Sequence, residues 1–206
     1  MSTKKRKGKG KAKERVDAVK VKVRPAYLDR DPYSFDPIED WAWKEYETTR
    51  AVSVIDFIDK YYKNSNWYIG TDSQQYSKPQ RCVFTTVLIA HHYDKDSGMG
   101  RGGSVIRYID KRPKIPLEAL SARLTVEVQR SIEICKFLET ELLNRSDDKN
   151  EYWKNIIGIS IDCNKDLKNK SARYKDALVG MVVGYGWNAF VKPDAWASSN
   201  VADRSC

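Results

Sequence analysis

The sequence predicts an α/β fold with a mixed five-stranded sheet flanked by helices, in the order β-β-β-α-β-α-β-α. Three segments with strand-like alternation, residues 67–74, 81–93 and 104–112, follow one another through short turns. They are typical of an antiparallel meander. After residue 112, helical and strand-like segments alternate, as they do around parallel strands. Together these two patterns predict a sheet that is antiparallel on one side and parallel on the other.

The meander is preceded by an aromatic segment and a helix. Tyrosine, phenylalanine and tryptophan alternate with acids and prolines over residues 25–43, which favours an extended strap lying on the domain. Thr49 can cap a helix that runs to about Tyr62, since apolar residues recur there at helical spacing.

A glycine motif between the second and third strands is not interpreted as a nucleotide site. Gly98, Gly100 and Gly103 spell G-x-G-x-x-G. The dinucleotide-binding fingerprint needs a strand before it and a helix after it, whereas a strand follows here. Asp94 and Asp96 in the same loop are interpreted as turn residues rather than as cation ligands.

The second half of the chain predicts alternating helices and strands. A long helix begins near Pro116, where proline suits the first turn, and ends near Leu143. A strand over 155–164, a helix over 171–186 capped by Ser171, a strand over 188–194 and a short final helix follow.

The net charge of +9 belongs to the N-terminus. Residues 1–24 carry eight lysines and three arginines against two acids, and the rest of the chain has equal numbers of acids and bases. This divides the chain into a disordered basic arm (1–24), a strap and N-terminal helix (25–66) and a main domain (67–206). The arm is a candidate for binding nucleic-acid phosphates, with a solubilising tail as the alternative. Its candidate contacts are Lys4, Lys5, Arg6, Lys7, Lys9, Lys11 and Lys13.

The composition of the sequence bears on the cellular compartment in which we expect the protein. No stretch has the roughly 18 uninterrupted apolar residues of a membrane-spanning helix, and no apolar segment follows the basic start as in a secretory signal. We therefore expect a cytoplasmic protein with no membrane partner. The four cysteines form no C-x-x-C pair, which argues against a zinc site.

Two acids occupy matching positions on separate strands. Asp72 follows Tyr68 and Gly70 on one face of the first strand, and Asp162 follows Gly158 and Ser160 on one face of the fourth. The small residue before each acid lets a substrate or another element approach closely. Ligands of open α/β sheets bind beyond the carboxyl ends of strands, so a paired-carboxylate site is expected there. Capping of a turn is the alternative for each acid taken singly.

The long helix contributes a third acid. At 100° per residue, Glu127 borders the apolar stripe, whereas Glu118 and Glu133 point away from it. A carboxylate at a buried face costs free energy unless it is paired, protonated or bound to metal. Converging carboxylates without a cysteine or histidine cluster predict Mg²⁺ or Mn²⁺ and phosphoryl-transfer chemistry by two metal ions.

These motifs resemble a known family. The segments IGTDSQ (69–74), RLTVEVQRSIEI (123–134), ISIDCN (159–164) and the C-terminal run 177–203 are similar to the YkuK-like family of ribonuclease H-related nucleases, within the ribonuclease H-like superfamily. The resemblance covers about residues 50–206 and implies a ribonuclease H-like fold. It implies that Asp72, Glu127, Asp162 and Asp203 are metal-binding carboxylates. Lys192 and Ser198 lie in its terminal motif, KPDAWASS, and Lys192 joins the candidate nucleic-acid contacts.

The predicted function is a metal-dependent nuclease that hydrolyses phosphodiester bonds, with nucleic acid as its partner. One alternative is a catalytically silent nucleic-acid-binding or scaffold module that keeps the fold. Another is a junction-cleaving or strand-exchange enzyme that acts as a homodimer. RNA, DNA, hybrid and branched substrates all remain open.

Overall fold

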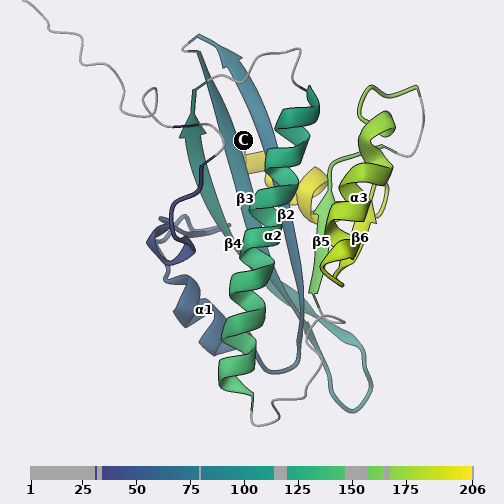
Figure 1. Cartoon of the computed structure of the whole chain (residues 1–206). Helices are drawn as coiled ribbons and strands as arrows, with labels where there is room; N and C mark the ends of the chain where they lie inside the picture. The colour runs from purple at the N-terminus through teal and green to yellow at the C-terminus, as the bar shows by residue number, and fades with distance from the viewer. Residues whose placement is uncertain are drawn as a thin grey trace, which may run out of the picture.

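The computed structural model describes residues 31, 34–78, 80–113, 120–146, 157–164 and 168–205. They form a mixed sheet with the strand order β1-β4-β3-β2-β5-β6 (Figure 1). The strands are β1 (Lys44–Glu45), β2 (Ser65–Ser77), β3 (Gln80–Tyr93), β4 (Gly100–Arg112), β5 (Ile157–Ile161) and β6 (Asn188–Val191).

The predicted fold class is confirmed, with one more strand than expected. β2, β3 and β4 form the antiparallel meander, and β5 and β6 extend it as parallel strands. The sixth strand is β1, whose two residues pair with β4 at Arg107 and Ile106. Two residues are too few for a period-2 pattern, so the sequence showed no strand there.

Helices cover both faces of this sheet. On one face lie α1 (Val54–Tyr61), α2 (Leu120–Arg145) and α3 (Lys175–Gly184), with α2 crossing the centre of the sheet (Figure 1). The C-terminal segment, a π-helix η6 (Ala197–Ala202) followed by a 3₁₀ turn η7 (Asp203–Ser205), lies behind the sheet and contacts β2 and β3.

The side chains of β2 point alternately to the two faces of the sheet, so they face either α2 or the C-terminal segment. The Thr71 hydroxyl meets Ser131 of α2 at 3.0 Å. Gly70 therefore faces away from α2, and a Cβ built there would come within 2.5 Å of the Ser198 backbone nitrogen in η6. The glycine allows the C-terminal segment to lie directly on β2. This is the close approach of another element that the small residue before Asp72 predicted.

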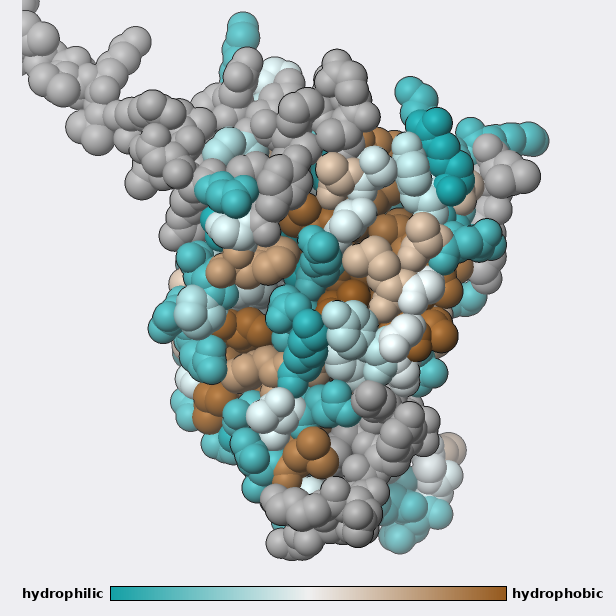
Figure 2. All heavy atoms as spheres, in the orientation of Figure 1, coloured by the Kyte–Doolittle hydropathy of each residue, from teal (hydrophilic) through white to brown (hydrophobic). Residues whose placement is uncertain are grey.

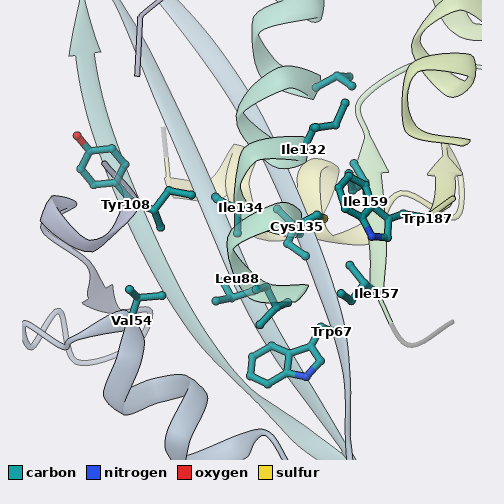
Figure 3. Close-up of a cluster of buried hydrophobic side chains, with 14 of the residues drawn as sticks. Val54, Trp67, Leu88, Tyr108, Ile132, Ile134, Cys135, Ile157, Ile159 and Trp187 are labelled. Atoms are coloured by element: carbon teal, nitrogen blue, oxygen red, sulfur yellow. The ribbon is translucent and has the colours of Figure 1, made fainter. Parts of the chain in front are cut away.

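The core lies between the sheet and the three α-helices. Trp67 and Leu88 from the meander, Cys135 from α2 and Ile159 from β5 are all fully buried there (Figure 3). The outward side of α2 is a hydrophilic band with hydrophobic residues on either side (Figure 2). This is the pattern of a helix with one buried face. Within the described residues, no helix is both long and apolar enough to cross a membrane.

The aromatic segment is part of the same core. Trp41 and Trp43 are buried, and the Trp41 ring stacks on Tyr108 of β4 at 4.4 Å between centroids. The helix after it begins later than predicted. Ser53 is its cap and accepts a hydrogen bond from the Asp56 backbone nitrogen, whereas Thr49 lies in the preceding turn at φ 59°.

A further local prediction is wrong. Ser171 does not cap α3: its side chain makes no capping bond, and a 3₁₀ turn (Ala172–Tyr174) separates it from the helix. The Ser171 carbonyl oxygen instead accepts a hydrogen bond from Cys163 Sγ at 2.9 Å, which ties the loop to the end of β5. The long helix α2 ends at Arg145, close to the predicted end near Leu143.

The glycine loop is a hairpin connection, as predicted. Asp94 Oδ1 accepts hydrogen bonds from the backbone nitrogens of Asp96 and Ser97, and its carboxylate pairs with Arg101. These bonds hold a turn between β3 and β4.

Candidate carboxylate site

Strand register brings Asp72 and Asp162 to corresponding positions. β2 and β5 pair in parallel from Trp67 opposite Ile157 to Gly70 opposite Ser160. Asp72 and Asp162 each follow two residues later. Asp72 is not at a strand end, however, because β2 continues to Ser77 against β3. It marks the point where the parallel pairing ends.

Glu127 reaches the same region from α2. Its side chain is 4% exposed, which agrees with its predicted position on the buried face. Ser73 Oγ donates a hydrogen bond to Glu127 Oε1 at 2.5 Å. By contrast, Glu133 is on the outer side of α2, where its carboxylate pairs with Lys136.

Arg123, one helical turn before Glu127, completes this contact between α2 and β2. Its Nη1 donates to the Ser73 carbonyl oxygen at 2.7 Å and to Ser73 Oγ at 3.2 Å. Ser73 is thus bonded to both α2 side chains, and its hydroxyl links the guanidinium to the carboxyl group.

The carboxylates line a cavity of about 240 Å³ between the N-terminal half of α2 and the ends of the parallel pairing. Three of the predicted site residues, Asp72, Glu127 and Asp162, contribute to its wall. The other lining residues are Leu120, Arg123, Leu124, Asn169, Lys170 and Ser171. A larger cavity of about 530 Å³ lies elsewhere, between α1, the β1 turn and β4. The predicted site is therefore a small polar cavity and not the largest hollow of the described chain.

Burial and mutual repulsion perturb two of these acids. Burial, followed by the charge of Asp162, raises the pKa of Asp72 from 3.8 to about 6. Burial, followed by the charge of Asp72, raises the pKa of Glu127 from 4.5 to about 8, although the Ser73 hydrogen bond opposes this shift. Near neutral pH the cluster therefore holds a proton that isolated carboxylates would have lost.

Asp162 has a cationic partner. Lys192 follows β6 immediately, just as Asp162 follows β5, and the two strands pair in parallel up to Ile161 opposite Val191. This register brings the Lys192 ammonium onto Asp162 Oδ1 as an ion pair. The Lys192 side chain is 35% exposed, so it lies at the rim of the site.

Asp203 is brought near the others without lining the cavity. It begins η7, and its side chain is exposed. The charge of Asp203 nevertheless contributes to the raised pKa of Asp72. Asp203 thus approaches Asp72 from the C-terminal layer, on the side of the sheet opposite α2.

Within the part of the chain that the structure describes, the carboxylates do not form a preformed metal-binding site. Among the described residues, no group of three or more His, Cys, Asp or Glu side chains is placed to hold an ion. The donor chemistry does fit Mg²⁺ or Mn²⁺, since carboxylate oxygens are the ligands that these cations prefer. Lys192 competes with such a cation for Asp162, since its ammonium is paired with Asp162 Oδ1.

Sequence reasoning missed Ser73 and Arg123. Both could have been found from the pattern that identified Glu127. Arg123 precedes Glu127 by four residues, so the two share a helical face, and Ser73 follows Asp72 on the side of β2 that faces α2. Lys170 and Asn169 had no such signal, because they lie in an irregular loop.

Several predicted residues lie outside the described part of the chain. They are Glu118 and the basic-arm residues Lys4, Lys5, Arg6, Lys7, Lys9, Lys11 and Lys13.

Comparison with known proteins supports the family resemblance. A family model described as Ribonuclease H-like matches residues 50–206. The match begins shortly before α1 and includes every carboxylate considered above. Neither the curated proteins nor the solved structures gave a significant match.

Proposed function

Because the chain belongs to the YkuK-like ribonuclease H-like family, we propose that it is a metal-dependent nuclease that hydrolyses phosphodiester bonds. In this proposal Asp72, Glu127, Asp162 and Asp203 hold Mg²⁺ or Mn²⁺, and nucleic acid is the substrate. The family supports a nuclease-type or nucleic-acid-binding role. The carboxylate site supports the more specific role of a metal-dependent nuclease.

The observation that carries the proposal is the convergence of three carboxylates from different elements on one cavity. Asp72 comes from β2, Glu127 from α2 and Asp162 from the residue after β5. A single aspartate after a strand is commonly a turn cap. Turn capping does not account for Glu127, which is buried inside a helix and hydrogen-bonded to the neighbouring strand.

The electrostatics of the cluster favour a cation. Asp72 and Glu127 are almost fully buried, the charge of Asp72 raises the pKa of Glu127, and the charge of Asp162 raises the pKa of both. Such a cluster is costly in its fully ionised form, and a divalent cation relieves the repulsion. Bound Mg²⁺ or Mn²⁺ would supply activation of the attacking water and neutralisation of charge on the phosphate.

The protein's own residues orient this site. Ser73 holds the Glu127 carboxyl group by one oxygen, which leaves the other oxygen for a ligand. Gly70 allows η6 to lie on β2 and thereby brings Asp203 toward Asp72. Leu120 and Leu124 form an apolar part of the cavity wall.

A silent nucleic-acid-binding module is the second candidate, and the Asp162–Lys192 ion pair favours it. An ammonium on a proposed metal ligand gives that carboxylate a counter-charge without metal. In that case the carboxylates would serve structure only.

A cleavage screen separates the two candidates. The full-length protein is incubated with single-stranded and duplex DNA, RNA, an RNA–DNA hybrid and a branched junction, in Mg²⁺, Mn²⁺ or EDTA. The nuclease proposal predicts cleavage of at least one substrate that is lost in EDTA and in the Asp72→Asn and Asp162→Asn variants. No cleavage of any substrate would favour the silent module, whereas cleavage that survives in both variants would contradict the assignment of catalysis to these carboxylates.

A further inference from the structure

The carboxylate cavity also has a cationic side. Arg123 and Lys170 line it together with the three acids. A polyanionic substrate that enters a cavity walled by carboxylates is repelled unless cations meet its phosphates. Arg123 is the better placed of the two, since it is part-buried and fixed by hydrogen bonds, whereas Lys170 is an exposed surface lysine.

The hydrogen bonds of Arg123 use only one end of its guanidinium group. Nη1 donates to the Ser73 carbonyl oxygen and to Ser73 Oγ. Within the described part of the chain, Nε and Nη2 have no hydrogen-bond partner. A guanidinium carries five donors in a planar fork that matches phosphate oxygens. The bonds to Ser73 therefore hold the fork at the cavity and leave donors for a ligand.

Arg123 does not serve mainly to neutralise the acids beside it. Asp72 and Glu127 both keep a raised pKa, and the charge of Arg123 is a minor opposing contribution to each. No direct ion pair joins Arg123 to an acid among the described residues, unlike Arg112 and Arg130, which both pair with Asp110. The positive charge of Arg123 is thus largely uncompensated by direct contacts.

From these contacts we propose that Arg123 binds a backbone phosphate of the nucleic-acid substrate next to the carboxylates. The bond to Ser73 pre-orients the guanidinium, so little side-chain entropy is lost when the phosphate binds. Recognition through the phosphate is independent of base sequence. This inference rests on the proposed function for its choice of ligand and extends it by naming a substrate-binding residue.

The test measures binding of a fluorescein-labelled oligothymidine to the full-length protein by fluorescence anisotropy. EDTA is present so that no metal-dependent cleavage occurs, and the salt concentration is varied. Arg123→Gln should weaken binding about tenfold, as expected for loss of a charged hydrogen bond. It should also make the slope of log K against log salt less negative by about 0.7, which is the contribution of one phosphate contact on a single strand.

Three variants exclude a purely structural role. Arg123→Lys keeps the charge and should retain the wild-type salt slope. Ser73→Ala removes the hydroxyl that links Arg123 and Glu127 but keeps the guanidinium and its bond to the backbone carbonyl oxygen of residue 73, so it should weaken DNA binding less than Arg123→Gln does and keep the wild-type salt slope. Arg145→Gln removes the same charge from the far end of α2, where the guanidinium pairs with Asp59 and Glu141, and should leave affinity and slope unchanged.

Arg123→Gln binding with wild-type affinity and slope would overturn the inference. So would equal losses in Ser73→Ala and Arg123→Gln, because they would show that Arg123 acts only by holding α2 on β2. Failure of the proposed function is recognised separately: wild-type protein that binds no Mn²⁺ in calorimetry is not a metal-dependent nuclease, whatever the DNA-binding result.

Discussion

Asp72 and Asp162 each lie two residues beyond the paired residues Gly70 and Ser160 of two neighbouring parallel strands. The backbone pairing of β2 with β5 therefore sets the spacing of the two acids, and no loop is needed to bring them together. Sites on strands are held more rigidly than sites on loops, which suits a pair of like charges that must stay close.

Glu127→Gln should reduce metal-dependent cleavage by at least about tenfold, since it removes the negative charge of a buried ligand while keeping the Ser73 hydrogen bond. Glu133→Gln, on the outer side of the same helix, is the matched control and should retain full activity. Steady-state cleavage rates in Mg²⁺ provide the comparison. Equal losses in the two variants would contradict the assignment of Glu127 to the site.

Gly70→Ala should destabilise the protein and impair the site together. The added methyl group would meet the Ser198 nitrogen at 2.5 Å and the Ala197 carbonyl carbon at 2.7 Å, so η6 must shift and carry Asp203 with it. Overpacking of this kind costs about 1–3 kcal/mol. Gly180→Ala on α3, where a Cβ has open space, should instead gain about 0.5–1 kcal/mol. Urea unfolding of both variants measures the difference, and a neutral Gly70→Ala would show that the close approach is not needed.

Stability of the metal-free protein should fall as the pH rises from about 5 to about 8.5. The folded protein raises the pKa of Asp72 to about 6 and that of Glu127 to about 8. Between the unfolded and folded pKa values, the native state holds protons that the unfolded chain has released, so raising the pH favours unfolding. Urea midpoints measured in EDTA across this range test the sign.

Saturating Mn²⁺ should flatten this dependence of stability on pH. In metal-free protein, Glu127→Gln should remove the fall in stability that occurs above about pH 6. A Glu127→Gln variant with the wild-type slope would mean that Glu127 is not the group that titrates.

Lys192→Met should bind Mn²⁺ more tightly than the wild-type protein does. The Lys192 ammonium pairs with Asp162, which the cation must recruit, and the pair is partly exposed. A pair of this kind is worth up to about 1 kcal/mol, so its loss should tighten binding by up to about fivefold. Lys192→Arg keeps the charge and serves as the control. Weaker Mn²⁺ binding by Lys192→Met than by wild type would show that Lys192 supports the site instead of competing for it.

The sheet and the positions of its acids could be predicted because both depend on periodicity. Alternation along β2 and β5 identified Asp72 and Asp162, and the helical repeat of α2 identified Glu127. β1 could not be predicted, since Lys44 and Glu45 form a strand only because β4 offers an edge beside them. The cap at Ser53 was missed because Thr49 is equally suitable by residue type, and only the turn at Thr49 excludes it.

Contacts between elements could not be predicted from the sequence either. Nothing in the spacing of Lys192 shows that its ammonium lies on Asp162, because this pairing follows from the order of β5 and β6 in the sheet. The position of Asp203 opposite α2 depends in the same way on the packing of η6 against Gly70.

The central claim is that the carboxylates hold a divalent cation, and calorimetric titration of the full-length protein with Mn²⁺ tests it most directly. Wild-type protein should bind Mn²⁺ with saturation, and Asp72→Asn should weaken that binding by at least about tenfold, since Asp72 interacts electrostatically with Glu127, Asp162 and Asp203. Asp72→Asn should also be no less stable than wild type in EDTA, because it relieves repulsion. No saturable Mn²⁺ binding, or equal binding by the wild type and Asp72→Asn, would contradict the account.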